Sequence, residues 1–195
     1  MKKTEKISAS AVDLAAIILA AGGVGVLPTD TIYGIVGSAL RKKTVERIYR
    51  LRRRDTKKPM IVLISSLADL RLFGIALNKK ERVLAQRMWP GKVSIVMPCP
   101  SKKFAYLHRG MKTLAFRMPE PSWLRTLLKR TGPLVAPSAN LAGDPPAKTI
   151  TEAKRYFAAN VEFYANAGRR ISRPSTIIKI ENGTLSVLRK GAVIV

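Results

Sequence analysis

The stretch Pro28-Thr29-Asp30-Thr31-Ile32-Tyr33-Gly34 joins a short apolar run, residues 24–27, to a segment that is too polar and too rich in turn-forming residues to be core. Two threonine hydroxyls, one carboxylate and one phenol fall within residues 29–33. A strand that ends in such a cluster often presents ligand-binding groups at the edge of an α/β sheet. The alternative is a hairpin or strand-to-helix turn whose Asp and Thr side chains cap local amides. A second polar cluster far along the chain, Ala136-Pro137-Ser138-Ala139-Asn140, favours the ligand-binding interpretation.

Apolar patterning on both sides of this stretch predicts alternating helices and strands without internal repeats. We expect helices over 10–21, 44–51, 78–88, 121–129 and 149–158, and Asn78 and Thr149 each open a capping pattern. We expect strands over 24–27, 60–64, 93–97, 114–118, 161–164, 176–180, 185–188 and 192–195, with Asn182-Gly183 as a hairpin turn. No Pro- or Gly-rich linker divides the chain, so residues 1–195 are predicted to form one mixed α/β domain.

Length and composition indicate a globular protein of the cytoplasm. A chain of 195 residues with 47% hydrophobic residues can bury one sizeable core. The longest apolar stretch, 14–26, contains two adjacent glycines and is too short to span a bilayer, so we expect no membrane association. The N-terminus lacks a clean signal-peptide pattern. The single cysteine, Cys99, excludes an intramolecular disulfide and fits a reducing compartment.

The charge is strongly basic. There are 36 Lys and Arg against 12 Asp and Glu, a formal net charge of +24, with a sequence pI near 10.9. Such an excess favours polyanions, and residues 41–58 alone carry ten basic side chains against two acidic ones. For most of those ten, a solvated helix face is the alternative explanation. Aromatic residues are only 6%, without a base-stacking series, so we expect general RNA affinity and not sequence-specific reading of single strands.

The sequence lacks the residues that several common catalytic and binding sites require. A single histidine, His108, gives no basis for a histidine metal site or a Ser-His-Asp triad, and in its basic surroundings we expect it at the surface. Cys99 stands between two prolines and is expected to be inert packing. A phosphate-binding P-loop is missing, because Gln86 stands where the upstream glycine would be needed before Gly91-Lys92. A nucleotide would have to be bound by side-chain cations, hydroxyls and amides.

Such groups stand at the ends of predicted elements. Arg52 and Arg54 lie between a helix and a strand, where they suit phosphates, and alternate residues of an extended segment point the same way. Ser138 and Asn140 offer a hydroxyl and an amide from a turn between Pro137 and Gly143. Further hydroxyls and guanidinium groups are expected near strand ends at Thr113, Arg117, Ser175 and Arg189. Each of these residues has a structural alternative, as a turn cap or a solvated charge.

Five motifs taken in order resemble the YrdC family. They are 28–34, Trp89-Pro90-Gly91, Leu114-Ala115-Phe116-Arg117-Met118-Pro119, Ala136-Pro137-Ser138-Ala139-Asn140 with Gly143, and Ser175-Thr176-Ile177-Ile178 closed by Leu188-Arg189-Lys190-Gly191. The resemblance covers about 22–191, nearly the whole chain. It implies a single domain with a twisted mixed sheet, flanked by helices, that carries a basic concave ligand-binding face. It also implies a threonylcarbamoyl-AMP synthase of the short type, a nucleotidyltransferase that joins L-threonine, bicarbonate and ATP, releases pyrophosphate and feeds the t6A modification of tRNA.

The resemblance gives the scattered groups their roles. It implies that L-threonine is bound by Thr31, Arg117, Ser138 and Ser175, and ATP by Arg54, Lys58, Thr113, Asn140, Lys148 and Arg189. It places Arg52, Arg54, Ser138 and Asn140 at the catalytic centre. The reaction joins a carboxylate of N-carboxy-threonine to the α-phosphate, so it needs orientation and neutralisation of crowded anions more than a protein nucleophile. We expect Mg²⁺ on the phosphates without protein ligands, and a downstream threonylcarbamoyl transferase as a partner, besides tRNA.

Some positions depart from the family pattern. Arg52 stands where the family usually has lysine, Asp55 where it has proline, Lys58 where it often has asparagine and Leu63 where many members have histidine. The run Pro145-Pro146-Ala147-Lys148 replaces a more common Ser-Pro-Thr run. Arginine in place of lysine keeps the charge but changes the hydrogen-bonding geometry. These departures leave open a paralogue that lost the synthase activity. The charge of +24 supports one such alternative, an RNA-binding or ribosome-associated YrdC-like protein without synthase activity, and a carbamoyl-transferring relative that uses carbamoyl phosphate is a further alternative.

Overall fold

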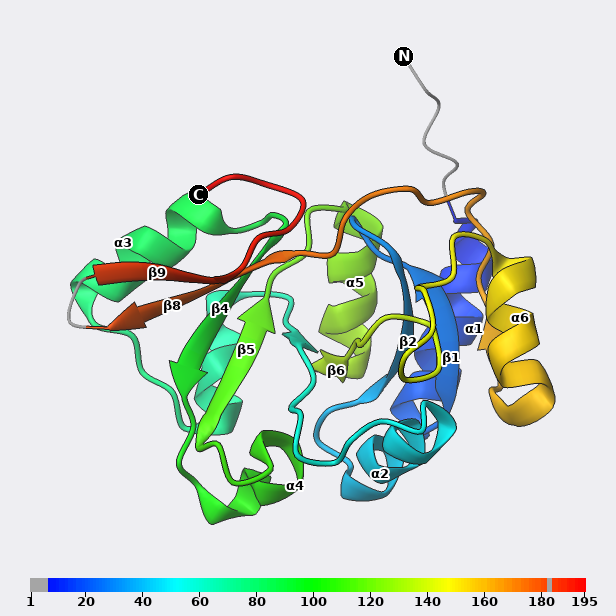
Figure 1. Cartoon of the computed structure of the whole chain (residues 1–195), viewed down its shortest axis with the longest axis horizontal. Helices are drawn as coiled ribbons and strands as arrows, with labels where there is room; N and C mark the ends of the chain where they lie inside the picture. Colours follow the sequence, from blue (N-terminus) through cyan, green and yellow to red (C-terminus); the bar gives the residue numbers. More distant parts are fainter. Residues whose placement is uncertain (1–6, 182–183) are drawn as a thin grey trace.

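The computed structural model describes residues 7–181 and 184–195. Within these residues the chain forms a nine-stranded sheet with helices packed against it (Figure 1). Its strand order is β7-β1-β2-β6-β3-β5-β4-β8-β9. The strands are β1 (Val24–Pro28), β2 (Tyr33–Ser38), β3 (Val62–Leu63), β4 (Val93–Pro98), β5 (Thr113–Arg117), β6 (Leu134–Val135), β7 (Phe163–Tyr164), β8 (Thr176–Glu181) and β9 (Thr184–Arg189). The pairs β1–β7, β3–β5 and β4–β8 are parallel and the others antiparallel, so the sheet is mixed, as predicted.

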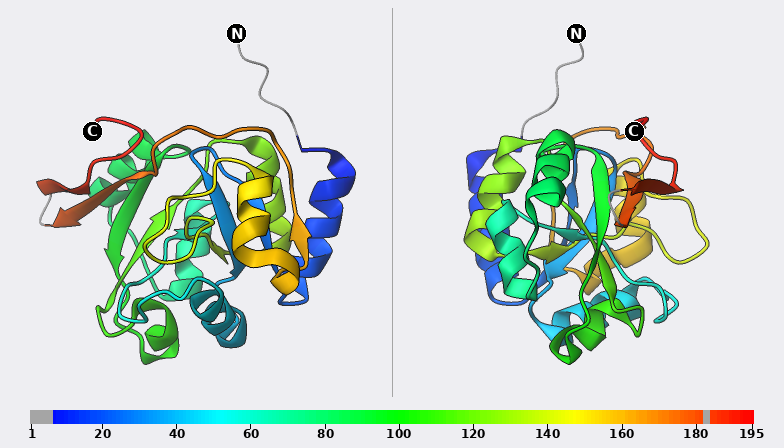
Figure 2. Two further views of the ribbon diagram at one scale, coloured as in Figure 1. Left: turned by 45° about the vertical axis from the view of Figure 1, so that its right-hand side comes forward. Right: turned by 90° about the vertical axis from the view of Figure 1, so that its left-hand side faces the viewer.

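Helices cover both faces of the central strands (Figure 2). On one face α1 (Ala9–Ala20) and α5 (Ser122–Thr131) share a core with Leu27, Val36 and Leu63. On the other face α2 (Lys42–Leu51) and α6 (Ile150–Phe157) pack on Val24, Val26 and Ile35 in a larger core. The remaining helices are α3 (Lys79–Met88), α4 (Ala105–His108), η1 (Leu67–Phe73), η2 (Lys102–Phe104) and η3 (Ala158–Asn160). Alternate residues of β1 therefore serve opposite layers, as the two-residue period of a strand requires.

Local sequence explains where several helices begin. The Asn78 side chain accepts a hydrogen bond from the Glu81 amide at 2.9 Å, and the Glu81 carboxylate accepts from the Asn78 amide at 2.9 Å. The Thr149 hydroxyl accepts from the Glu152 amide at 3.2 Å. The predicted capping box at Asn78 is confirmed, whereas at Thr149 only the hydroxyl half is formed, because the Glu152 carboxylate accepts from the Lys148 amide at 2.7 Å. Each cap satisfies an amide that would otherwise lack a partner in the first helical turn.

Close packing explains the glycines of the first hairpin. A Cβ atom added at Gly25 would lie 2.1 Å from the Phe163 ring, and one added at Gly37 would lie 2.5 Å from Cγ2 of Thr44 on α2. The sheet and its neighbours meet here at backbone distance. Gly37 lies in β2 together with Gly34, and these two glycines lower the strand propensity of β2, which was not predicted.

Other differences from the predicted elements are confined to short segments. Residues 192–195 do not form the predicted strand, because the Ala192 amide donates to the Pro174 carbonyl and the Val193 carbonyl accepts from the Thr176 hydroxyl, which leaves no ladder. The strands expected over 60–64 and 161–164 shrink to two residues each, and β6 was not predicted. The predicted turn at Asn182-Gly183 lies outside the described residues.

Two expectations about single residues have opposite outcomes. Cys99 is buried, as expected for packing. His108 is only 5% exposed, so the expected surface position is wrong. The carbonyl of Ser101 lies 3.3 Å from its Nε2, and its Nδ1 accepts from the Gly110 amide at 3.2 Å. Both ring nitrogens therefore have local backbone partners. Within the described residues, no helix is long and apolar enough to cross a membrane.

Candidate functional site

A cavity of about 140 Å³ opens where the β1–β2 hairpin, the end of β5 and the start of β8 meet. Its wall brings together the polar residues of several distant motifs with a few apolar ones. The lining residues are Thr29, Thr31, Ile32, Tyr33, Gly34, Arg54, Pro59, Met60, Ile61, Arg117, Ala136, Pro137, Ser138, Pro174, Ser175, Ile177 and Arg189.

The opening stretch of the sequence forms the loop of the β1–β2 hairpin. Pro28 pairs with Tyr33, and the Thr29 amide donates to the Ile32 carbonyl at 3.0 Å across the loop. The Thr29 hydroxyl donates to the same carbonyl at 2.8 Å. The hairpin interpretation is confirmed for the threonines, since Thr29 also accepts from the Thr31 amide at 3.2 Å. Asp30 does not cap a local amide but accepts from the distant Glu120 amide. The same loop lines the cavity, and its ligand-binding role stays a prediction.

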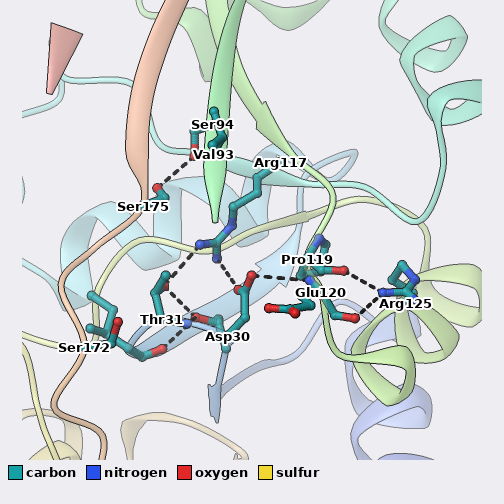
Figure 3. A network of polar contacts seen from close by, with 12 residues as sticks. Asp30, Thr31, Val93, Ser94, Arg117, Pro119, Glu120, Arg125, Ser172 and Ser175 are labelled. Atoms are coloured by element: carbon teal, nitrogen blue, oxygen red, sulfur yellow. Dashed lines mark hydrogen bonds and ion pairs between the residues drawn. The ribbon is translucent and has the colours of Figure 1, made fainter. Parts of the chain in front are cut away.

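Arg117 ends β5 at the floor of the cavity, and its side chain is only 5% exposed. Its Nη1 donates to the Thr31 hydroxyl at 3.1 Å, and its Nη2 lies 3.4 Å from Oδ1 of Asp30 (Figure 3). Oδ2 of Asp30 accepts from the Glu120 amide at 3.3 Å. Burial lowers the pKa of Arg117, and the Asp30 charge opposes that shift. The carboxylate thus helps to keep a desolvated guanidinium charged.

The second polar cluster lies beside the first. Gly34 and Ser138 form an isolated antiparallel bridge, and the Ala139 amide donates to the Tyr33 carbonyl at 2.9 Å. These bonds place Ser138 in the wall that the hairpin loop also forms. The resemblance assigns Thr31 and Ser138 to the same ligand, and the structure brings both residues to one cavity.

Arg52 supports this wall from behind. Its Nη2 donates to Oδ1 of Asn140 at 2.9 Å and to the Ser138 hydroxyl at 3.2 Å, and its Nε donates to the Asn140 carbonyl at 3.0 Å. Burial, aided by the charge of Arg54, lowers the pKa of Arg52 to about 10. The Asn140 amide group donates to the carbonyls of Leu141 and Asp144 at 2.8 and 2.7 Å. Arg52 and Asn140 thus hold the Ser138 loop.

The last part of the chain supplies a third wall. The hydroxyls of Ser175 and Ser94 lie 2.9 Å apart, and both residues are buried (Figure 3). Arg189 on β9 donates through Nη2 to the Ser175 carbonyl at 2.7 Å and to its hydroxyl at 3.3 Å. Sequence reasoning missed Ser94. Its signal was a single hydroxyl inside the apolar run 93–97.

Three arginines line the cavity without a carboxylate side chain among the lining residues of the described chain. Arg54 donates to the carbonyls of Lys58 and Pro59, both at 3.1 Å, so its guanidinium is fixed at the rim. Burial lowers the pKa of Arg54. Burial also lowers the pKa of Arg189, and the charges of Arg117 and Arg54 lower it further. Several positive charges around one small cavity repel one another and favour the binding of an anion between them.

Comparison with known proteins fits this arrangement. A family model for Sua5, YciO and YrdC proteins, described as "Telomere recombination", matches residues 17–191. The chain belongs to the Sua5/YciO/YrdC family. The resemblance seen in the sequence motifs is therefore confirmed.

Relatives within the Sua5/YciO/YrdC family differ in length. A threonylcarbamoyl-AMP synthase of Pyrococcus abyssi is 29% identical over 96% of this chain, which is 56% of that protein. A threonylcarbamoyl-AMP synthase of Thiobacillus denitrificans is 32% identical over 84% of this chain and 88% of its own length. The crystal structure of P. abyssi Sua5 complexed with L-threonine matches with a TM-score of 0.87 and 29% identity, over 96% of this chain and 56% of that one. This chain thus spans about half of the archaeal protein.

The cavity collects most, but not all, of the residues that the family resemblance singles out. All four residues predicted for L-threonine line it, namely Thr31, Arg117, Ser138 and Ser175. Of the six predicted for ATP, only Arg54 and Arg189 line it. Lys58 and Lys148 are exposed, Asn140 lies behind the wall, and Thr113 begins β5, whose other end carries Arg117. The ATP roles of these four remain predictions.

The expected alignment of Arg52 and Arg54 is not observed. The chain is not extended there, because Arg52 caps α2 in a helical conformation and Arg53 adopts a φ of 49°. Arg52 consequently turns towards the Ser138 loop, whereas Arg54 lines the cavity. Seven of the ten basic residues in 41–58 are exposed, as expected for a solvated face.

Leu63, at a family histidine position, does not line the cavity. It pairs with Arg117 in the sheet and is fully buried in the core shared with α1 and α5. Within the described residues, no group of three or more His, Cys, Asp or Glu side chains could hold a metal ion.

Proposed function

We propose that this protein is a threonylcarbamoyl-AMP synthase, which joins L-threonine, bicarbonate and ATP and releases pyrophosphate. The observation that carries the proposal is the convergence of three arginines and the hydroxyls of Thr31, Ser138 and Ser175 on one cavity. The relatives named as such synthases in P. abyssi and T. denitrificans support it, as does the L-threonine in the archaeal Sua5 crystal structure.

The size of the cavity suits the amino acid better than the nucleotide. At about 140 Å³ it is well below the roughly 300–1,000 Å³ of sites that enclose drug-sized ligands. We therefore assign the cavity to L-threonine, with its carboxylate on Arg117 and its other polar groups on the three hydroxyls. ATP would lie across the mouth, where Arg54 and Arg189 are less buried than Arg117.

The chemistry then requires positioning more than a protein nucleophile. The threonine amine nitrogen forms a bond to the bicarbonate carbon, a C–O bond of bicarbonate breaks, and water leaves, which gives N-carboxy-threonine. A carboxylate oxygen of this carbamate then forms a bond to the α-phosphorus of ATP. The bond from that phosphorus to the bridging oxygen breaks, and its electron pair leaves with pyrophosphate. Arg54 and Arg189 would neutralise the oxygens on which charge accumulates, and the fixed hydroxyls would hold the carbamate in line.

Mg²⁺ would accompany ATP and not a protein site. The lining residues in the described chain include no carboxylate, and Asp30 is engaged by Arg117 and the Glu120 amide, so they do not fit a protein-bound divalent ion. Phosphate oxygens would be its ligands.

RNA and a downstream enzyme complete the proposed context. The exposed basic residues of 41–58, together with a net charge of +24, support affinity for tRNA through its phosphates. The product would pass to a threonylcarbamoyl transferase that completes the t6A modification. The alternative, an RNA-binding protein without synthase activity, rests on the same charge.

The test measures pyrophosphate release and the product together. We expect release from ATP only when L-threonine and bicarbonate are both present, and mass detection of threonylcarbamoyl-adenylate. Arg117→Ala should abolish synthesis with RNA affinity intact, whereas Arg130→Ala, on an exposed pair with Asp13, should have no effect. If neither substrate stimulates release while RNA binds tightly at moderate salt, the RNA-binding alternative is correct.

A further inference from the structure

The hydrogen bonds of the hairpin loop fix the direction of each hydroxyl proton. A threonine hydroxyl has one hydrogen to donate and two lone pairs to accept. Thr29 donates its hydrogen to the Ile32 carbonyl at 2.8 Å, and that carbonyl can only accept. In the 3.0 Å contact between the hydroxyls of Thr29 and Thr31, the donor must therefore be Thr31. Thr29 also accepts from the Thr31 amide at 3.2 Å, which occupies its second lone pair.

The hydroxyl of Thr31 can consequently make only one more hydrogen bond, as an acceptor. Its hydrogen goes to Thr29, and one lone pair accepts from Nη1 of Arg117 at 3.1 Å. Thr29 and Thr31 are 4% and 3% exposed, so bulk water offers these hydroxyls little alternative. One lone pair of Thr31 remains, and the residue lines the cavity. Towards a ligand, this hydroxyl can accept but not donate.

The neighbouring side chains offer hydrogen-bond donors to a ligand. Arg54, Arg117 and Arg189 line the cavity and can only donate. The Ser138 oxygen accepts from Arg52 at 3.2 Å, so its hydrogen is available to a ligand. Thr31 thus sets an acceptor directly beside the strong donor Arg117.

We propose that Thr29 is a positioning residue: it accepts the hydroxyl hydrogen of Thr31 and so leaves Thr31 able only to accept from a ligand. Arg117 and Thr31 then together recognise a carboxylate next to an N–H donor. An α-amino acid presents these two groups on one carbon. The nitrogen keeps an N–H as the ammonium ion, as the free amine and as the carbamate, so the contact can persist through carboxylation. The inference rests on the proposed function, because it assumes that the cavity binds the amino acid.

The experiment compares two ligands on two variants of the full chain. The ligands are L-threonine and 3-hydroxybutyrate of matching configuration, in which hydrogen replaces the amine, and binding is measured by calorimetry. Thr29→Val removes the hydroxyl and keeps the branched shape, and Thr29→Ser keeps the hydroxyl. We expect Thr29→Val to raise the Kd of L-threonine about tenfold, the scale of one hydrogen bond, and to change the Kd of 3-hydroxybutyrate by less than about twofold. Thr29→Ser should bind both ligands as the wild type does.

Steady-state kinetics provide an independent readout. The KM for L-threonine should rise in Thr29→Val while the KM for ATP stays constant, a split that general loss of structure would not give. If Thr29→Val does not fold, the same ligand pair is tested on Thr31→Val, which should lose the preference for the amine.

The outcomes separate the two proposals. Equal weakening of both ligands by Thr29→Val, no change in either, or a preference for the amine that survives in Thr31→Val would overturn the assigned polarity. Failure of the wild type to bind L-threonine at all would overturn the proposed function and, with it, this inference.

Discussion

Asp30 and Arg117 form a buried ion pair, with Oδ1 of Asp30 3.4 Å from Nη2 of Arg117 and side chains that are 2% and 5% exposed. Asp30 comes from the hairpin loop and Arg117 from the end of β5, so the pair joins the two segments that form the floor of the cavity. The threonine carboxylate would therefore meet an arginine that is already oriented by a fixed partner.

Removing the carboxylate should destabilise the protein. Asp30→Asn leaves the Arg117 charge buried without its counter-charge, and breaking such a pair typically lowers the free energy of unfolding by about 3 kcal/mol. Urea denaturation measures the change. Asp13→Asn is the matched control, because its partner Arg130 is exposed, and we expect a change below about 1 kcal/mol. Equal losses in the two variants would contradict the role of the buried pair.

Replacing Arg117 with lysine should not preserve substrate binding. A lysine ammonium is a point charge and cannot contact Asp30, Thr31 and a carboxylate with the planar geometry of a guanidinium. We expect the KM for L-threonine to rise at least about tenfold in Arg117→Lys, the effect of losing one good hydrogen bond to a charged group, with the KM for ATP unchanged. Arg130→Lys should behave as the wild type in the same assay. An unchanged KM for L-threonine in Arg117→Lys would refute the assignment.

Arg52 should affect both stability and activity although it does not line the cavity. Arg52→Ala leaves the Asn140 side chain and the Ser138 hydroxyl without their donor, and we expect a loss of about 2 kcal/mol in the free energy of unfolding. Synthesis should fall as well, since Ser138 loses its support. Arg52→Lys, with the residue usual in the family, should lie between Ala and the wild type. Arg50→Ala, an exposed neighbour, should change neither stability nor synthesis.

Acid should destabilise the protein partly through Glu162. Burial opposes ionisation of this carboxylate, but hydrogen bonds from Arg47 at 2.6 Å and from the Val24 amide at 2.8 Å lower its pKa below its ordinary value near 4.5. A pKa that is lower in the folded state means that the contribution is present above about pH 4.5 and is lost as pH falls through the folded-state value.

The pH dependence of unfolding checks this sign. In Glu162→Gln, the free energy of unfolding should be lower than in the wild type at pH 7, and the two should converge as the pH drops below 4.5. Glu120→Gln, at an exposed glutamate, should follow the wild type throughout. A constant difference between Glu162→Gln and the wild type across this range would rule out the linkage.

The sequence predicted elements that have strong local signals. The apolar runs of β1 and β4 and the capped starts of α3 and α6 can each be recognised from a few consecutive residues. The strand β2 carries two glycines, and a Cβ atom added at one of them, Gly37, would lie 2.5 Å from Thr44. The composition of β2 therefore argues against a strand. Tertiary packing decides there against local propensity.

The sequence indicated many of the residues that form the site but not how they are arranged in space. A strand has two ends, and the sequence did not show that Arg117 and not Thr113 faces the cavity; four residue steps of about 3.3 Å separate them. The buried place of Arg52 was equally hidden, because an arginine in a basic run resembles a solvated one. Only the folded chain shows that Arg52 meets the Ser138 loop, 86 residues further on.

The third wall of the cavity comes from the segment 174–189, which follows the other lining residues in the sequence. Arg189 holds Ser175, and Gly191 lies so close to the Pro174–Ser175 backbone that an added Cβ would come within 2.4 Å of the Pro174 carbonyl oxygen. During synthesis on the ribosome, the hairpin loop, Arg117 and Ser138 therefore emerge well before their last partners. A nascent chain that stops before residue 189 would carry most of the amino-acid contacts and lack one of the arginines assigned to ATP, so the cavity wall is complete only after residue 189 has been translated.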